Sequence, residues 1–477
     1  MEILDFDMAV GPGYGEGQYG LTVVLSPVGY VFGKFEFSPQ LEQLVGKWKS
    51  PDRFRSSNEM SVEDVRREGA ILFDALMNGR VREAFSDSRA YAQRQGKGLR
   101  VTLRMIAPEL AALHWETLFD PEKGAFLSLS NETYLMRGLD VPQLLRANPF
   151  IPPIRILGVL SSPRDLPALD LKRERNDVEK ALSKLSKDGL VEIEWLENPT
   201  LRDLQRALSP AKGPWHIFHY AGHSYYDSAQ GDGFIALTDS EGKAMSVSAK
   251  KLGTLLANHS SLRLVYLGTD MGAVGGDDDS TSGLAMTIYR QGVPAVLSYQ
   301  GHVFDKMALL FAQSFYESIC DGLTIEAALA QARITLQLED EWGASWLLPV
   351  LYCHSADAAQ FRAETQVSDA PDERGKKGKP AAKKQEITKL SGEQYERFKN
   401  ALVSAYDAEE LKRMVRSCMD ADLEAVAGGT DNLTTVVSDL VLWAERTGRL
   451  GALINGALRS NPTNPDLRQF AESLDLS

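Results

Sequence analysis

Two polar side chains in the middle of the sequence each follow a short apolar segment. His223 comes after residues 214–222 (PWHIFHYAG), and Asp270 comes shortly after residues 262–268 (LRLVYLG). If both segments are neighbouring parallel strands, their carboxyl ends meet at one edge of a sheet and the two side chains face each other there. An imidazole in that position can act as a general base. The pair is therefore a candidate active site, with an ordinary salt bridge as the alternative.

Other potentially reactive residues have simpler interpretations. His216 and His219 lie inside segment 214–222, so we expect packed or hydrogen-bonded core residues. Cys320, Cys353 and Cys418 are far apart in the sequence, a spacing that fits neither a disulfide framework nor a zinc site. We expect these cysteines to be reduced and buried. We predict neither a metal site nor a cofactor.

A glycine motif near the start has the spacing of a nucleotide-binding loop but the wrong context. Gly15, Gly17 and Gly20 form G-x-G-x-x-G in the segment 11–20 (GPGYGEGQYG). A dinucleotide-binding motif follows a strand and opens a helix, whereas this one precedes the apolar segment 20–26. The motif predicts a β-hairpin or a flexible turn.

The elements that would position the candidate pair alternate between strand-like and helix-like segments. The helical stretches include DVEKALSKL (177–185) and TLRDLQRAL (200–208), the second of which opens with Thr200 as a cap and Asp203 three residues later. Such alternation predicts a mainly parallel sheet with helices on both faces. The first 150 residues are less regular, with a long helix starting near Ser61. The predicted strands are 20–26, 99–106, 154–162, 190–196, 214–222, 262–268 and 294–300.

Composition changes sharply after residue 365. Residues 366–390 hold almost no large apolar side chains and are rich in Lys, Pro, Gly and Ala, which predicts a disordered linker. The pattern beyond it is purely helical: the pairs Ser391/Gln394 and Asp407/Glu410 have capping-box spacing, and five or six short helices predict a small all-α bundle. The expected division is therefore 1–150, 151–365, 366–390 and 391–477.

The charge balance and the apolar pattern exclude some classes of partner. The net charge of −13 disfavours binding to nucleic acid or to an anionic membrane, since either needs a cationic surface. The opening residues lack a basic leader, and no later stretch is apolar for long enough to cross a bilayer. We expect a cytoplasmic protein.

Four segments between residues 114 and 352 resemble the CHAT group of caspase-like cysteine proteases, in the clan of caspases, separases and gingipains. They are HWETLFDPEKGAFLSLS (114–130), FHYAGHS (218–224), RQGVPAVLSYQGHVFDKMALLFAQSFYESICDG (290–322) and WLLPVLY (346–352). The resemblance implies an α/β fold with a caspase-like, mainly parallel sheet flanked by helices. Residues 1–150 would form an N-terminal pseudo-caspase half, and 151–365 the catalytic half. Within the first segment, Trp115 and Glu116 are expected to serve packing and capping.

The same resemblance assigns roles at the candidate site. His223 corresponds to the general base, and Asp270, within LGTDMGA (267–273), falls where the group has its nucleophilic cysteine. The backbone N–H groups of Ser224, where the group usually has glycine, and of residue 270 correspond to the oxyanion hole. A carboxylate is a poor nucleophile towards a peptide, so peptide cleavage should be lost. The chain is then an engineered inactive form or a natural pseudoenzyme.

Residues 391–477 resemble the effector-associated domain found beside proteases, nucleases and NADases in bacterial immunity systems. The resemblance rests on LSGEQYERFKNAL, DAEELKRMVR, LTTVVSDLVLWAERTGRLGALI and NPTNPDL. It implies a death-fold-like adaptor that pairs with a similar domain on a sensor or partner. Together, the two resemblances imply a cysteine endopeptidase effector in bacterial, antiphage-type defence that acts on a protein substrate. The alternatives are a non-cleaving scaffold, and a hydrolase that uses Asp270 and His223 on a non-peptide substrate.

Acidic residues near the candidate pair suggest a substrate preference. Asp227 follows His223 closely, and Asp277, Asp278 and Asp279 follow residue 270. Clan members recognise the side chain before the cleaved bond with a charged pocket, so these carboxylates would favour Arg or Lys there. A solvated loop is the alternative interpretation of 277–279.

Overall fold

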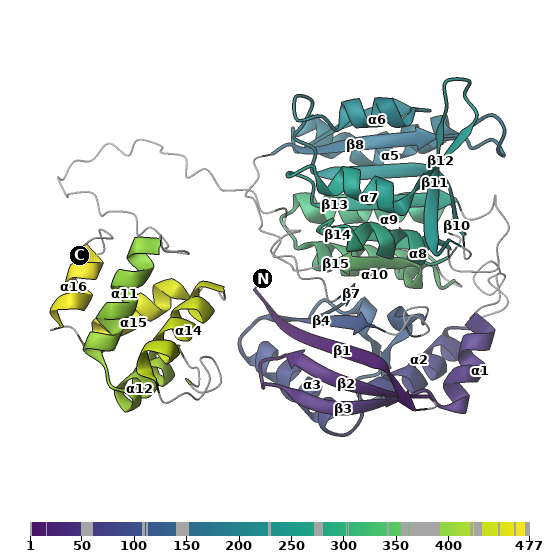
Figure 1. Cartoon of the computed structure of the whole chain (residues 1–477). Helices are drawn as coiled ribbons and strands as arrows, with labels where there is room; N and C mark the ends of the chain where they lie inside the picture. Colours follow the sequence, from purple (N-terminus) through teal and green to yellow (C-terminus); the bar gives the residue numbers. More distant parts are fainter. Residues whose placement is uncertain are drawn as a thin grey trace, which may run out of the picture. The chain divides into compact units, whose positions relative to one another are not determined.

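The structure is a computed structural model that divides into two compact units, Met1–Val367 and Ser368–Ser477 (Figure 1). The predicted linker 366–390 lies outside the residues that the structure describes. Those described residues are 2–15, 17–48, 61–106, 110, 113–139, 152–227, 230–270, 280–301, 303, 305–340, 343–353, 361, 392–419, 423, 432–446, 449–461 and 464–472.

The first unit is built on a 13-stranded sheet, with a separate two-stranded ribbon of β5 (Phe119–Asp120) and β6 (Ala125–Phe126). The main path of the sheet runs β9-β8-β10-β13-β14-β15-β7-β4-β1-β2-β3, and β11 and β12 branch from β10. The strands are β1 (Ile3–Gly15), β2 (Gln18–Leu25), β3 (Val31–Glu36), β4 (Gly98–Met105), β7 (Thr133–Gly138), β8 (Ile154–Ser161), β9 (Val191–Glu197), β10 (Ile217–Asp227), β11 (Asp232–Thr238), β12 (Ala244–Ser248), β13 (Leu264–Asp270), β14 (Ala295–Tyr299) and β15 (Pro349–Cys353).

The main sheet consists of two parallel parts that run in opposite directions. Strands β9, β8, β10, β13 and β14 are parallel to one another, and so are β15, β7, β4 and β1. The reversal falls between β14 and β15, which pair antiparallel over residues 295–299 and 349–353. The predicted mainly parallel sheet is confirmed. The carboxyl ends of the two parts therefore lie at opposite edges.

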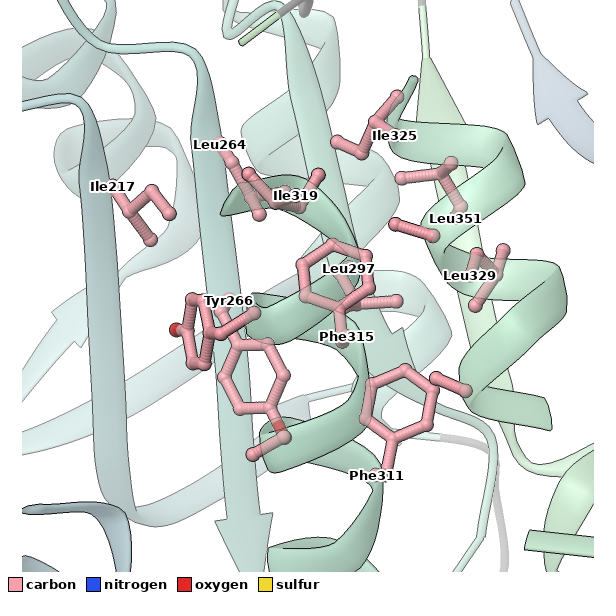
Figure 2. Packing of buried hydrophobic residues seen from close by; sticks show 14 of the residues in the cluster. Ile217, Leu264, Tyr266, Leu297, Phe311, Phe315, Ile319, Ile325, Leu329 and Leu351 are labelled. Carbon is pink, nitrogen blue, oxygen red and sulfur yellow. The ribbon is translucent and has the colours of Figure 1, made fainter. Parts of the chain in front are cut away.

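Helices cover both faces of the part of the sheet that contains β8, β10, β13 and β14, as the alternating pattern predicted. On one face, α5 (Leu171–Lys187), α9 (Asp305–Cys320) and α10 (Ile325–Glu339) bury a single apolar cluster. Figure 2 shows this packing, with Leu264 and Leu297 of the strands against Phe315 and Ile319 of α9. On the other face, the cluster includes α6 (Leu201–Ala207), α7 (Ala249–Ala257) and α8 (Ser280–Arg290).

The N-terminal part of the sheet packs one face against its own helices. The helices are α1 (Pro39–Trp48), α2 (Val62–Leu76) and α3 (Gly79–Arg94), and alternate apolar side chains of β1, β4 and β7 complete the cluster. Helix α2 starts where the sequence predicted, since the Ser61 side chain accepts a hydrogen bond from the N–H of Asp64. The predicted hairpin between β1 and β2 is also confirmed, and Gly17 takes the positive φ of 66° that favours glycine.

A buried ionic cluster joins the two parts of the sheet. Arg137 on β7 donates hydrogen bonds to both carboxylate oxygens of Glu116, at 3.1 and 2.6 Å, and to the side-chain oxygen of Gln300 at 2.9 Å. Arg333 of α10 lies 3.9 Å from the same carboxylate. Burial by itself raises the pKa of Glu116, but Arg137 and Arg333 outweigh it and hold the net pKa below its usual range. Glu116 is thus an ion-pair partner, whereas Trp115 packs in the core.

The second unit is a helical bundle with its own core. Its described helices are α11 (Gly392–Ala405), α12 (Ala408–Met419), α14 (Leu433–Arg446), α15 (Leu450–Ser460) and α16 (Pro465–Glu472). Phe398 and Phe470 stack at 4.7 Å, and the predicted capping box is present because Asp407 and Glu410 exchange hydrogen bonds of 3.1 and 2.8 Å. Ser391 of the other predicted box lies outside the described residues.

Candidate functional site at the carboxyl edge of the sheet

Residues 223 and 270 lie side by side on neighbouring strands. The parallel register of β10 and β13 pairs His223 with Asp270, and this is the last pair of the ladder. Beyond it, residues 224–227 of β10 turn away and pair with β11. The sequence placed both residues just past their strands. In the structure, β10 instead continues to Asp227, because its end pairs with β11, and β13 includes Asp270.

The His223 ring is buried and held by a backbone carbonyl. Its side chain is 1% exposed, and its Nε2 lies 2.8 Å from the carbonyl oxygen of Pro167. A carbonyl can only accept a hydrogen bond, so in the neutral ring Nε2 carries the proton and Nδ1 carries the free lone pair. Nδ1 is buried and has no hydrogen-bond partner among the described residues. The ring is therefore oriented so that Nδ1 is the nitrogen able to accept a proton in the neutral form.

Pro167 contacts the candidate site, and sequence reasoning missed it. It lies in the segment between β8 and α5 and contributes only its backbone oxygen to the site. Because every residue has such an oxygen, residue type gives no sign of this role.

The remaining predicted site residues are placed as follows. Ser224 is buried in β10. Its φ is not positive, because Asn198 is the only described non-glycine residue with a positive φ. A serine therefore fits at this position without backbone strain. Asp227 closes the turn to β11 by accepting hydrogen bonds from the backbone N–H and the side-chain amide of Gln230. Asp277, Asp278 and Asp279, and the side chain of Asp270, lie outside what the structure describes.

A cavity of about 170 Å³ opens beside the His223/Asp270 pair. Gly222 and Gly268, near the ends of β10 and β13, form part of its wall, together with Ala221. His219, Tyr266 and Tyr299 also line it, together with residues of α5 and α9. The volume is close to the roughly 150 Å³ of an engineered protein cavity that binds benzene. The cavity can therefore hold one side chain of a bound molecule.

His219 is a core histidine, as the sequence predicted, and it remains neutral. Its Nδ1 is 3.1 Å from the hydroxyl of Tyr316, and its ring stacks on Tyr266 with 4.6 Å between centroids. Burial lowers its pKa to about 4. His216 is likewise hydrogen-bonded within the core, with its Nδ1 accepting from the N–H of Arg155 at 3.0 Å, and burial, with smaller effects of Arg263 and Arg155, lowers its pKa to about 4.

We expect the first unit to lose stability as the pH falls from 6.5 to 5. The pKa of His219 is about 4 in the folded chain and 6.5 ordinarily, so within this window only the unfolded chain takes up the proton. This histidine alone should lower the free energy of unfolding by about 2 kcal/mol between pH 6.5 and 5. Urea denaturation at several pH values measures the slope, and His219→Phe should reduce it. An equal slope in that variant would contradict the buried, neutral state.

The cysteines and the metal-ligating side chains of the described residues offer little further chemistry. Cys353 is buried, Cys320 is half-buried, and both are free thiols. Burial, and then nearby Asp321 and Glu317, raises the pKa of Cys320 to about 12, so this thiol is a poor nucleophile. The described residues contain no group of three or more metal-ligating side chains, and none of their helices is long and apolar enough to cross a membrane.

The sheet and the helices on its faces define an α/β module, with His223 at the carboxyl edge of one of its parallel parts. The CHAT domain model matches residues 66–380, well over half of the chain, and the chain belongs to this family. Residues 388–475 match the model of effector-associated domain 1. A search of curated proteins found no match.

Solved structures with similar folds include separase and a caspase. Separase from Saccharomyces cerevisiae in its complex with securin has 17% identity and a TM-score of 0.32 over 54% of this chain in one structure, and 15% and 0.30 over 68% in another. The chain spans only 15% and 20% of those separase chains. The Drosophila initiator caspase Dronc has 11% identity and a TM-score of 0.27, covering 44% of this chain and 85% of the caspase. The family assignment rests on the family models.

Proposed function

We propose that the chain is a caspase-like endopeptidase effector of a bacterial immunity or conflict system, held inactive by Asp270 at the nucleophile position. The observation that supports this most directly is the His223 ring, whose Nε2 is bound by Pro167 while Nδ1 is left without a partner beside residue 270. An imidazole in this state can take a proton from a nucleophile on the adjacent strand. The test is proteolysis by the Asp270→Cys variant.

An aspartate at position 270 replaces the thiol nucleophile but still places a negative charge beside His223. A thiolate beside an imidazolium is the reactive form of a Cys/His pair, and a carboxylate in place of the thiolate keeps the same charges. Attack by that carboxylate on a peptide would form a mixed anhydride from a weak nucleophile. The proposed oxyanion donors are the N–H groups of Ser224 and residue 270, which the β10–β13 register brings to one edge.

A second candidate function is a pseudoprotease that binds a protein segment without cutting it. Asp270 favours this function for the chain as it stands, and the intact cavity next to His223 supplies a place for a bound side chain. The two functions differ in one outcome. If Asp270→Cys confers cleavage, the architecture is that of a protease, and if it does not, the scaffold function stands.

The C-terminal unit is proposed to recruit the effector by pairing with a similar domain of a sensor or adaptor. We expect a fragment of residues 388–477 to fold alone, because its core cluster and its Asp407/Glu410 capping box are internal to the unit. Cooperative thermal unfolding of the isolated fragment, monitored by circular dichroism, checks this. Leu411→Asp, which places a carboxylate at a fully buried position, should abolish the transition, and exposed Glu409→Gln is the matched control.

A further inference from the structure

The contacts that hold the backbone and the ring of His223 both lead to one hairpin. This β11–β12 hairpin pairs residues 234–238 with residues 244–248 in antiparallel register. Strand β10 ends its pairing with β13 at His223, and residues 224–227 pair with β11 instead. The histidine therefore stands where its strand changes partners, and its position depends on how that change is held.

Tyr220 joins the backbone of His223 to β11. Its side chain is fully buried, and its hydroxyl lies 2.8 Å from the carbonyl oxygen of His223 and 3.0 Å from that of Ala236 on β11. Burial raises the pKa of the phenol, which therefore keeps the proton that it shares between these two acceptors. The hydroxyl thus bridges β10 and β11 at the point where β10 changes partners.

Gly222 leaves the space that this hydroxyl occupies. A Cβ at position 222 would lie 2.5 Å from the Tyr220 hydroxyl and 2.8 Å from the carbonyl oxygen of Ser161. Cβ atoms in proteins essentially never come so close to other atoms, and the second of these neighbours is backbone. Any larger residue would therefore displace the phenol or the end of β8. The segment before His223 is built around the hydroxyl of Tyr220.

A second set of contacts joins the imidazole ring to the same hairpin. The carbonyl oxygen of Pro167, 2.8 Å from Nε2 of the ring, belongs to the loop between β8 and α5. In that loop, the carboxylate of Asp165 accepts a hydrogen bond of 2.7 Å from the N–H of Ala244, the first residue of β12. The N–H of Arg164 donates to the carbonyl of Gly242, in the turn of the hairpin, at 3.0 Å. The loop that orients the ring is thus fastened to the hairpin.

We propose that Tyr220 and Asp165 are positioning residues through which the β11–β12 hairpin sets the orientation of His223. The inference rests on the proposed function, because it concerns the imidazole that is proposed there as the base. A general base must lie within hydrogen-bond reach of the proton that it accepts, and a misplacement of about 1 Å is costly. Tyr220 holds the backbone, and Asp165 holds the loop that carries the Pro167 oxygen. The ring leaves its position only when one of these contacts opens.

Exchange of the Nε2-bound proton of His223 with water tests the inference in the full chain with Asp270 in place. Selective ¹⁵N labelling of the seven histidines makes this proton visible by NMR, and its absence in His223→Ala assigns it. The hydrogen bond to Pro167 should slow its exchange. Tyr220→Phe and Asp165→Ala should each speed the exchange about threefold to tenfold, the effect of one lost hydrogen bond. Asp165→Asn keeps an accepting oxygen and should stay within about twofold of the parent chain.

Tyr225→Phe is the matched control for the loss of a phenolic hydroxyl. Tyr225 also lies on β10, but its hydroxyl bonds to that of Ser246 on β12 at 2.9 Å, so its removal should leave the exchange unchanged. Three results would each overturn the inference: a parent chain without a protected Nε2 proton, equal exchange in the two tyrosine variants, or equal exchange in Asp165→Ala and Asp165→Asn. Because Asp165 is exposed, this last comparison decides even when circular dichroism shows that Tyr220→Phe does not fold.

Activity separates this inference from the proposed function. In the Asp270→Cys background, Tyr220→Phe and Asp165→Ala should lower kcat about threefold to tenfold and leave KM unchanged, because they disturb the base and no substrate contact. A raised KM with an unchanged kcat would contradict the positioning role. Proton exchange is measured without cleavage, so an inactive Asp270→Cys variant contradicts the endopeptidase alone.

Discussion

Replacing Asp270 with cysteine is expected to turn the chain into a thiol-dependent endopeptidase. The new thiol would stand beside His223, whose Nδ1 is oriented to accept its proton. A thiolate attacks a peptide carbonyl well at low basicity, whereas a carboxylate does not. Cleavage of a peptide library containing arginine peptides, measured with and without a thiol-alkylating reagent, gives the readout. The unmodified chain should show no activity above the uncatalysed background.

Two further variants make this experiment specific to the proposed site. In the Asp270→Cys background, His223→Ala should lower kcat/KM by about 10²- to 10⁴-fold, the range typical of a general base. Asp270→Ser should stay inactive, because a hydroxyl is far less acidic than a thiol. Thiol-sensitive proteolysis by the chain with Asp270 would contradict the assignment of residue 270, since Cys353 is buried and the pKa of Cys320 is raised to about 12.

Arg137→Met should cause the largest loss of stability among single changes in the first unit. It removes the hydrogen bonds to Glu116 and leaves a carboxylate that is 1% exposed without its main partner. Breaking a buried ion pair from one side costs about 3–5 kcal/mol, and Arg333 at 3.9 Å offsets only part of this. The free energy of unfolding from urea denaturation should fall accordingly, against the roughly 5–15 kcal/mol that folded domains possess.

Arg175, which forms ion pairs at the surface, provides the control for the buried Arg137. Arg175 on α5 donates to Glu179 at 2.8 Å and to Glu197 at 2.7 Å, with its side chain substantially exposed. Arg175→Met should change stability far less than Arg137→Met, because exposed ion pairs contribute little. Replacing Glu116 with Gln in the Arg137→Met background should recover part of the loss, because a neutral amide is cheaper to bury than a carboxylate. Equal effects of the two arginine variants would show that the buried cluster is solvated.

Much of the fold could be predicted from local patterns. The strand and helix segments between residues 154 and 300 follow from apolar runs, and the starts of α2 and α6 follow from capping residues such as Ser61 and Thr200. The order of the strands in space could not be predicted. Chain order gives no sign that β15 pairs with both β14 and β7, because that arrangement depends on contacts between residues far apart in the sequence.

The candidate site could also be predicted from the sequence only in part. His223 and residue 270 could be found from strand ends and motif spacing, and the register places them together. The Pro167 oxygen could not, because it belongs to the backbone. The acidic side chains of α5 look in the sequence like an ordinary solvated helix face, and only the fold places them in the lining of the cavity that also contains Tyr266 and Tyr299. Likewise, Glu116 and Arg333 are more than 200 residues apart in sequence and meet only in the folded core.

The place of β15 in the sheet has a consequence for synthesis. This is the last described strand of the first unit to leave the ribosome, yet it lies between β14 and β7 in the interior of the sheet. Until residues 349–353 emerge, a nascent chain that has formed the other strands has open edges at both β14 and β7. Unpaired edges of this kind invite pairing with other chains, and such long-range closure is slow. Completion of the unit is therefore a late event in its biogenesis, and a stalled or truncated chain is the form most exposed to aggregation.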